Sequence, residues 1–309
     1  MSKSYLLKKA FWWLLTCLIC AVAIFWIVPR NDFSAPKKTT VLSLWNVDTF
    51  EGGKGSRPSF LGKIAARFEK ENDGVLIMVS AKTPSGAKAA MEKGEVPDLL
   101  SFGSYFSCGT PLVEPSVWCQ GGYALYSFSE DFSKANASNT VLSLGGNNQP
   151  LVAAALYGFS GVLFVEDSTT AYVKFLNGEY EYLLGTQRDA CRFVSRGVAV
   201  KMRALGEFSD LKQYIAPLKE ENKKLANAFI EYLLAETSQK LVVEIGMLSA
   251  KYDIYGDDAP LQNALEAEKR LYTTSPFMDE SASEEMKNAA LSVLHGSNKE
   301  LLKNFLKRS

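Results

Sequence analysis

Charged and aromatic side chains gather where one predicted strand ends, and their chemistry suits contact with a polar molecule. Trp45 closes the strand, and Asp48, Glu51 and Arg57 follow it in a glycine-rich loop. Carboxylates and guanidinium groups can hydrogen-bond hydroxyl groups, while an indole offers an apolar ring face. The alternative is that Trp45 packs in the core and that the three charged side chains are solvated on the loop.

Two further places have residue types suited to ligand contact. Ser101, Phe102 and Gly103 end another predicted strand, where a glycine allows backbone to approach a ligand closely. Tyr123 and Tyr157 could provide aromatic faces on which a ring stacks. The alternative for both tyrosines is packing in the core or at the rim of a site.

A run of four polar residues, Thr186, Gln187, Arg188 and Asp189, follows an apolar segment that is predicted to be a strand. These side chains could contact a ligand. Equally, Arg188 and Asp189 could form an ion pair across a hinge. We take Thr186, Gln187 and Arg188 as candidate ligand contacts and leave the structural alternative open.

Several other kinds of chemistry lack the residues that they need. His295 is the only histidine and ends a predicted helix, so neither histidine-based catalysis nor a histidine-ligated zinc site is expected. The glycine-rich segment 52–55 lacks the spacing and the Lys-Ser/Thr ending of a phosphate-binding loop. A glycosidase would use paired carboxylates, but Asp48, Glu51 and Asp189 carry no further motif. We therefore expect no enzyme activity, no cofactor and no metal.

The charge and the cysteine content limit the kinds of partner that the protein could bind and the compartments in which it could lie. Lysine plus arginine equals aspartate plus glutamate, at 34 each, so no field of one sign would attract nucleic acid. Five cysteines are too few for a disulfide scaffold. Cys108 and Cys119 could pair in an oxidising compartment or remain two reduced thiols, and Cys191 is expected to be buried.

The N-terminal region contains an uncharged apolar run from Ala10 to Val28, which is long enough to cross the hydrocarbon core of a membrane as a helix. Three tryptophans lie near its two ends, where indoles favour the membrane interface. We expect residues 1–30 to form an uncleaved transmembrane anchor. A cleaved secretory signal is the alternative, although its apolar region would be shorter. Either reading exports the rest of the chain.

Beyond a linker at residues 31–40, predicted strands alternate with predicted helices. Strands are expected at 41–45, 75–79 and 98–103, and helices at 59–73 and 86–94. This alternation predicts right-handed crossovers and a parallel sheet, in which ligands bind beyond the carboxyl ends of the strands. The fold class is therefore α/β.

A series of motifs spread over most of the exported part resembles one known family. In order, the motifs are Leu44-Trp45, Glu51-Gly-Gly-Lys-Gly-Ser-Arg57, Phe60-Leu61, Ala65-Ala-Arg-Phe-Glu-Lys70, Pro97-Asp-Leu-Leu-Ser-Phe-Gly103, Gly121-Gly-Tyr123, Phe175-Leu-Asn-Gly178, Leu184-Gly-Thr-Gln-Arg-Asp189, Ala228-Phe-Ile-Glu-Tyr-Leu-Leu234, Gln239-Lys-Leu241 and Ile245-Gly-Met247. No single motif is specific, but together and in this order they resemble the bacterial extracellular solute-binding proteins of ABC importers, in the carbohydrate-type group.

The resemblance implies a two-lobed fold of the type II periplasmic-binding-protein-like class, with a ligand cleft at the hinge. It places residues 41–122 and about 197–257 in lobe 1, and residues 123–196 and about 258–309 in lobe 2. It also implies capture of a small solute, a sugar or oligosaccharide, for ABC permease subunits in the membrane. The body would then be extracellular or periplasmic.

Two departures from the family's pattern leave a second function open. The segment between Tyr126 and Phe175 is shorter than the usual second lobe, and the predicted anchor stands in place of a lipid-modified cysteine. The alternative is an anchored sensor or interaction protein that retains the fold without transport.

Overall fold

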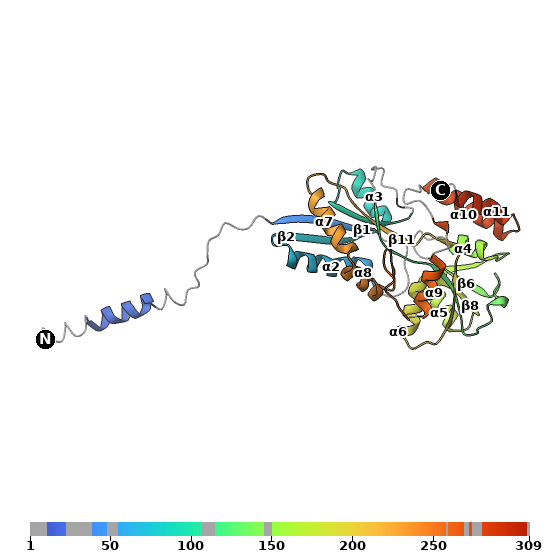
Figure 1. Cartoon of the computed structure of the whole chain (residues 1–309), viewed down its shortest axis with the longest axis horizontal. Coiled ribbons are helices and arrows are strands. Elements are labelled where there is room, and N and C mark those ends of the chain that lie inside the picture. The colour runs from blue at the N-terminus through green and yellow to red at the C-terminus, as the bar shows by residue number, and fades with distance from the viewer. Residues whose placement is uncertain are drawn as a thin grey trace. The chain divides into compact units, whose positions relative to one another are not determined.

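The computed structural model of the 309-residue chain describes residues 11–22, 39–47, 55–104, 106, 115–144, 150–257, 259–268, 272–273 and 280–307 (Figure 1). The chain divides into two units, Met1–Thr39 and Thr40–Ser309. In the first unit, residues 11–22 are helical, and the rest of the apolar run lies outside the described residues. Among the described residues, no helix combines the length and the apolar character that crossing a membrane requires.

The second unit is an α/β body built on two sheets. The larger sheet has the strand order β12-β4-β11-β3-β1-β2. Its strands are β1 (Thr40–Val47), β2 (Val75–Lys82), β3 (Leu99–Gly103), β4 (Ser116–Gln120), β11 (Lys212–Pro217) and β12 (Leu248–Ser249). β1 runs parallel to β2 and β3, whereas β11 is antiparallel to β3 and β4. The carboxyl ends of β1, β2 and β3 therefore meet at one edge of the sheet.

Helices cover both faces of the larger sheet. α2 (Arg57–Glu71) and α7 (Lys223–Leu234) pack against Leu44 in one core, and α3 (Pro84–Glu92) packs against Trp45 in another. Successive side chains of a strand point to opposite faces, so these two neighbours in β1 serve separate cores. The predicted strands and helices of this region are thus confirmed, with shifts of a few residues at their ends.

The smaller sheet has the strand order β7-β6-β8-β5-β9. Its strands are β5 (Tyr123–Ser127), β6 (Thr140–Leu144), β7 (Phe164–Asp167), β8 (Tyr182–Thr186) and β9 (Lys201–Leu205). β6 runs parallel to β7 and β8, and β5 is antiparallel to β8 and β9. The helices that accompany this sheet are α4 (Pro150–Tyr157), α5 (Ser168–Leu176), α6 (Gln187–Ser195), α9 (Ala259–Glu268) and α10 (Glu280–Leu294).

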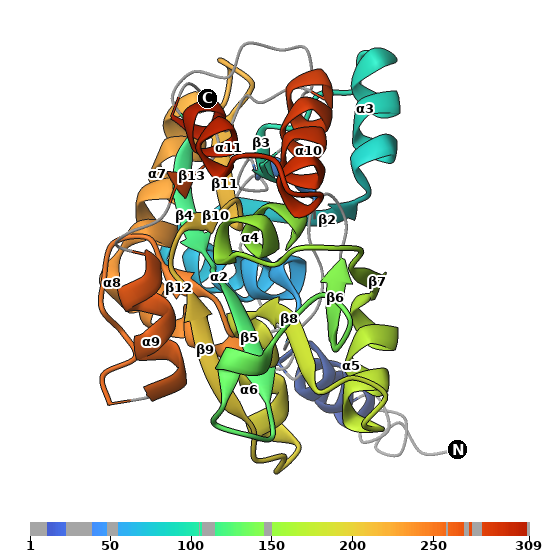
Figure 2. The same cartoon turned by 90° about the vertical axis from the view of Figure 1, so that its right-hand side faces the viewer.

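Alternation along β5 separates two layers of packing around the smaller sheet. Leu125 belongs to the core that includes residues of α4 and α10, and Tyr126 belongs to the core that includes residues of α5 and α6. The short pieces outside the two sheets are η1 (Phe132–Lys134), α8 (Glu236–Gln239), η2 (Lys240–Ile245), α11 (Lys299–Leu306) and the paired strands β10 (Phe208–Ser209) and β13 (Tyr272–Thr273). Figure 2 shows α10 and α11 next to each other, and α10 packs on α4.

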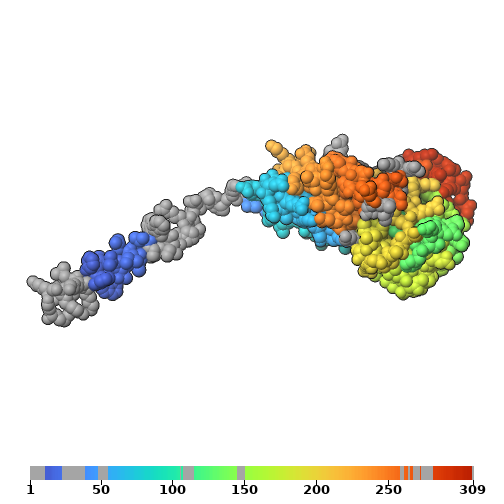
Figure 3. Space-filling model, turned by 60° about the horizontal axis from the view of Figure 1, so that its bottom comes forward, coloured from blue at the N-terminus to red at the C-terminus, as the bar shows by residue number. Residues whose placement is uncertain are grey.

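The two sheets lie at opposite ends of the body but share a core. In Figure 3 the early helices and α7 (cyan and orange) occupy one end, and the smaller sheet (green and yellow) lies at the other. One continuous hydrophobic cluster includes Phe60 and Trp118 from the layers of the larger sheet together with Leu125 and Leu156 from the layers of the smaller sheet. The two-lobed α/β architecture expected from the sequence is present.

The chain crosses from the larger sheet to the smaller one, back again, and a third time between β12 and α9; the second of these crossings lies later than expected. The first crossing, between β4 and β5, comes at Gly121–Gly122. We expected the chain to return near residue 197, but β9 still pairs with β5 in the smaller sheet. The return therefore falls between Leu205 and Lys212. The exact division into two lobes stays a proposal.

Candidate functional site

A buried polar cluster lies at the carboxyl ends of β1 and β3. Asn46 and Ser101 are register partners on these strands, and the Ser101 hydroxyl donates to Asn46 Oδ1 at 3.0 Å. The indole Nε1 of Trp118 donates to Ser101 Oγ at 3.0 Å, and Gln213 Nε2 donates to the backbone carbonyl of Val47 at 3.1 Å. All four of Asn46, Ser101, Trp118 and Gln213 are fully buried. We call these four residues the strand-end cluster.

Strand register and aromatic packing bring the cluster together. β11 runs antiparallel to β3, so that Gln213 lies opposite Gly103. The Trp118 ring stacks on Phe60 of α2, with centroids 5.5 Å apart and planes only 2° from parallel. This stacking holds the indole whose N–H donates to Ser101. The site therefore depends on contacts among β1, β3, β4, β11 and α2.

Two acceptor atoms at this edge stay unsatisfied among the described residues. Gln213 Oε1 is buried without a hydrogen-bond partner, and so is the hydroxyl of Ser104, one residue beyond β3. Buried polar atoms are nearly always hydrogen-bonded, so such atoms mark places where a further polar group fits. The cluster consists of amide, hydroxyl and indole groups, and it offers hydrogen bonds without charge.

Of the candidates at the ends of the first and third strands, Ser101 belongs to the cluster and its neighbours do not. Trp45 faces the other side of the sheet, where Lys82 Nζ lies 4.6 Å from the centroid of its ring. Phe102 is buried in that same core, and Gly103 pairs with β11. The alternative of core packing for Trp45 agrees with these contacts.

The charged candidates of the first loop are only partly described. Arg57 is 2% exposed and begins α2, whose N-cap Ser56 accepts a hydrogen bond from Ser59 N. Asp48 and Glu51 lie outside the described residues. Their contact with a ligand stays a prediction.

The side chain of Gln187 is hydrogen-bonded to the first crossing between the sheets. Its Oε1 accepts a hydrogen bond from Gly122 N at 2.8 Å, and its Nε2 donates to the carbonyl of Gly246 at 3.1 Å. A Cβ atom on Gly121 would lie 2.7 Å from Gln187 Oε1, so a side chain there would require the Gln187 amide to shift. The amide of Gln187 is fully buried and joins segments from both sheets.

Arg188 and Asp189 both make hydrogen bonds to backbone. Arg188 Nε donates to Ile245 O at 3.1 Å and its Nη2 donates to Gly55 O at 2.6 Å. Asp189 Oδ2 accepts from Thr186 N at 2.9 Å and thereby satisfies the start of α6. Burial raises the pKa of the Asp189 carboxyl, although the bond from Thr186 and the positive charges nearby act to lower it. The hydrogen bonds of Thr186, Arg188 and Asp189 therefore stabilise the folded chain.

Tyr123 follows the first crossing directly, and its side chain contacts residues of the second. Its hydroxyl donates to Asp210 Oδ1 at 2.7 Å, and its ring stacks on Phe208 with centroids 6.2 Å apart. The side chain is 1% exposed. This tyrosine therefore packs in the core, the alternative that the sequence left open.

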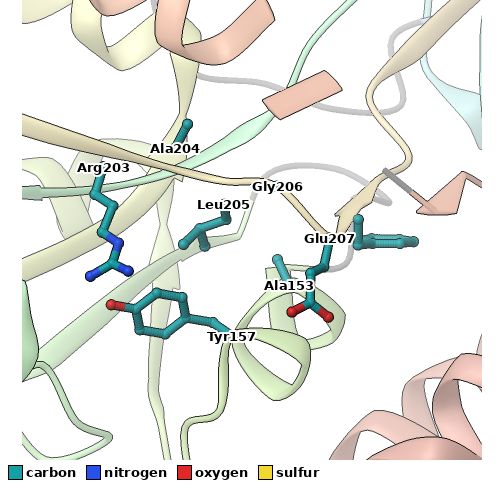
Figure 4. A pocket seen from close by; sticks show the side chains of 8 residues that line it. Ala153, Tyr157, Arg203, Ala204, Leu205, Gly206 and Glu207 are labelled. Carbon is teal, nitrogen blue, oxygen red and sulfur yellow. The ribbon is translucent and has the colours of Figure 1, made fainter. Parts of the chain in front are cut away.

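Tyr157 lies elsewhere, in a pocket of about 240 Å³ between α4 and the segment from β9 to β10. The pocket is lined by Ala153, Tyr157, Arg203, Ala204, Leu205, Gly206, Glu207 and Phe208. Figure 4 shows the Arg203 guanidinium beside the Tyr157 ring and the Glu207 carboxylate near Ala153. None of these residues belongs to the strand-end cluster.

Sequence reasoning missed Asn46, Trp118 and Gln213 in the cluster, and Arg203 and Glu207 in the pocket. Asn46 had a local signal, since it is a polar residue directly after an apolar strand. Gln213 had none, because a polar residue within a strand normally faces water. Among the described residues, no group of three or more histidine, cysteine, aspartate or glutamate residues could hold a metal ion.

Comparison with known proteins identifies the fold. No family model matches the chain, and no curated protein matches it. Among solved structures, the GacH receptor of Streptomyces glaucescens matches with a TM-score of 0.60 and 13% identity, over 87% of this chain and 97% of that one. An ABC substrate-binding protein from Listeria monocytogenes, in complex with cycloalternan, matches with a TM-score of 0.57 and 12% identity, over 87% and 98%.

The same fold occurs in a third solved structure. The maltose/maltodextrin-binding domain MalE from Bdellovibrio bacteriovorus, bound to maltotriose, matches with a TM-score of 0.56 and 11% identity, over 87% of this chain and 99% of that one. At such low identity the likeness concerns the fold. Nearly the whole length of each of these structures aligns with the chain. The chain has the two-lobed α/β fold of the substrate-binding proteins of ABC transporters.

Proposed function

We propose that the chain captures a small polar solute, a carbohydrate, between its two sheets and presents it to ABC permease subunits. The observation that carries this proposal is the unpartnered Oε1 of Gln213 in the strand-end cluster. That atom lies where the carboxyl ends of β1 and β3 meet, and ligands of α/β sheets bind at such edges. The solved structures with this fold, described above as binding proteins and receptors, support the same assignment.

The chemistry of the cluster suits a neutral, hydroxyl-rich ligand. Asn46, Ser101 and Gln213 supply amide and hydroxyl groups, and Trp118 supplies an indole. Hydroxyl groups of a sugar both donate and accept, so they fit an unpartnered carbonyl oxygen. Asp48 and Glu51 would add carboxylates at the same edge. The solute would be held by these bonds and released unchanged.

Anchoring and location belong to the same proposal. The uncharged run from Ala10 to Val28 supports a single membrane-spanning segment with the body outside the cell or in the periplasm. A body tethered in this way would remain next to permease subunits in the same membrane. No affinity for nucleic acid is proposed, because the formal charge is zero.

One observation favours the second candidate, an anchored sensor or interaction protein. Gln187 and Arg188 extend from α6 to backbone carbonyls of Gly55, Ile245 and Gly246. Opening the body for solute exchange would break these buried bonds. If these bonds keep the two lobes closed, the protein would recognise another protein and not a solute.

A solute screen tests the first proposal. The full chain in detergent micelles is heated with sugars, oligosaccharides, polyols and peptides, and each stabilising compound is then titrated by calorimetry. A solute at a hundred times its Kd should stabilise the fold by about 2.7 kcal/mol. A well-folded chain that no compound stabilises would favour the sensor, and a pull-down that yields a membrane partner would then support it.

A pair of variants locates the site. Gln213→Leu removes the unpartnered oxygen and should weaken solute binding by roughly ten-fold or more. Gln239→Leu is the matched control, because Gln239 is also fully buried and its amide donates to Trp118 O and Leu233 O. Equal losses of affinity in both variants would move the site away from the cluster.

A further inference from the structure

The pocket of Tyr157, Arg203 and Glu207 combines charge with an aromatic face, which the strand-end cluster does not. The two sites share no residue. We propose that this pocket is a second binding site, which takes a small ring compound that carries both hydroxyl groups and a carboxylate, such as a sugar acid. The proposal does not require the strand-end cluster to bind a solute.

Arg203 provides the charge for the carboxylate. Its side chain is exposed, and its Cζ lies 5.5 Å from the centroid of the Tyr157 ring. Within the described part of the chain, no carboxylate lies in ion-pair distance of this guanidinium, so its hydrogen-bond donors face solvent or a ligand. A guanidinium binds a carboxylate through two parallel hydrogen bonds, a geometry that an ammonium group cannot reproduce.

Glu207 does not neutralise Arg203, because two other cations already lie near it. Its carboxylate oxygens are 3.8 Å from Lys299 Nζ and 3.7 Å from Lys303 Nζ, both on α11. The positive charge of Arg203 therefore stays available to an anion. The Glu207 carboxylate remains a hydrogen-bond acceptor, and a hydroxyl group of the ligand could donate to it.

The rest of the pocket suits one ring. Tyr157 is half-buried, and its ring packs against Phe159 with centroids 5.2 Å apart, which fixes one aromatic wall. Ala153, Leu205 and Phe208 are buried and apolar. The volume of about 240 Å³ lies just below the roughly 300–1,000 Å³ typical of sites for drug-sized ligands. A single substituted ring is the matching size.

Calorimetric titration of the full chain in detergent micelles tests the proposal with two probes of one shape. Sodium D-galacturonate carries the carboxylate, and D-galactose has the same ring without it. We expect saturable binding of galacturonate, at least about ten-fold weaker binding of galactose, and weakening of galacturonate binding by added sodium chloride. Absence of saturable galacturonate binding would overturn the proposal.

Variants assign the binding to this pocket. Arg203→Gln should weaken galacturonate binding by about ten-fold or more while leaving galactose unaffected, and Tyr157→Ala should weaken both. Arg196→Ala, which removes another exposed arginine outside the pocket, is the matched control. Gln213→Leu, in the strand-end cluster, should leave galacturonate binding unchanged. The outcome for the strand-end site can therefore be told apart from the outcome for this pocket. Equal affinity in the Arg203→Gln and Arg196→Ala variants would contradict the assignment.

Discussion

The Nη2 atom of Arg188 donates a hydrogen bond of 2.6 Å to the backbone carbonyl of Gly55, which lies 133 positions earlier in the chain. Arg188 belongs to α6 on the smaller sheet, and Gly55 precedes α2 on the larger sheet. The same guanidinium donates to Ile245 O, and the side chain is 3% exposed. One buried cation therefore ties together three segments from both ends of the body.

Arg188→Ala should lower the free energy of unfolding by roughly 2–4 kcal/mol, because it removes two charge-assisted bonds and leaves two carbonyls unsatisfied. Urea denaturation followed by circular dichroism measures the loss. Arg196→Ala, at the opposite end of α6, is the control, since its exposed guanidinium lies 5.2 Å from the Tyr172 ring centroid and contributes about 1 kcal/mol at most. Similar losses in both variants would show that the bond to Gly55 is energetically unimportant.

Gly246→Ala should destabilise the body more than Gly178→Ala does. Both glycines have positive φ, of 65° and 75°, so an alanine is strained at either position. At Gly246 the new Cβ would also lie 3.2 Å from Cys191 Sγ, whereas nothing lies within 4 Å at Gly178. The additional crowding should cost about 1–3 kcal/mol. Thermal unfolding of the two variants measures the difference, and equal Tm values would mean that the Cys191 side chain moves aside.

Asp98 should support the fold at neutral pH and lose this effect in acid. Burial acts to raise its carboxyl pKa, but hydrogen bonds from Asn222 and Ser43, with the charge of Lys219, lower the pKa below the usual 3.8. Asn222 Nδ2 donates at 2.7 Å and Ser43 N at 2.8 Å. A carboxyl whose pKa is lower in the folded state than in the unfolded state stabilises the fold at pH values above its unfolded pKa. This stabilisation is lost as the pH falls through the folded pKa.

We therefore expect Asp98→Asn to cost about 1–3 kcal/mol at pH 7, and the difference from wild type to shrink as the pH falls below about 4. Urea midpoints measured between pH 7 and pH 3 follow this change. Asp257→Asn, at an exposed position, serves as the control and should have little effect at any pH. A difference for Asp98→Asn that stays constant with pH would rule out the titration as its cause.

Membrane retention is expected if the run from Ala10 to Val28 is an uncleaved anchor. Cells are fractionated, and the membranes are washed at high salt and at alkaline pH. The intact chain should stay in the pellet and enter solution only with detergent. A mature protein that appears in the supernatant without the residues before Ser34 would instead identify a cleaved signal.

The pairing of Cys108 with Cys119 also stays a prediction. Cys119 is buried in β4, and Cys108 lies outside the described residues. Mass mapping of exported protein without reductant should show the two linked peptides. Alkylation of both thiols under the same conditions would exclude the bridge.

The sequence by itself determined the alternating strands and helices between residues 41 and 103 and the α/β class, because these follow from local patterns of apolar residues. It also identified Ser101 at the end of a strand. It named Trp45 as the candidate and missed its neighbour Asn46, which belongs to the strand-end cluster. Alternation shows that neighbours in a strand point to opposite faces, but which face meets α2 depends on how the layers pack.

Only the tertiary structure decided which distant residues meet. Gln213 contacts Asn46 across 167 positions because β11 enters the larger sheet antiparallel beside β3. Likewise Arg188 and Gln187 looked like ligand contacts, since a polar run after a strand is typical of a binding loop. Their hydrogen-bond partners include backbone atoms of Gly55, Gly122, Ile245 and Gly246, which are distant in the sequence and come near only in the folded body. Hydrogen bonding depends on position and angle within a few ångströms, and long-range packing sets both.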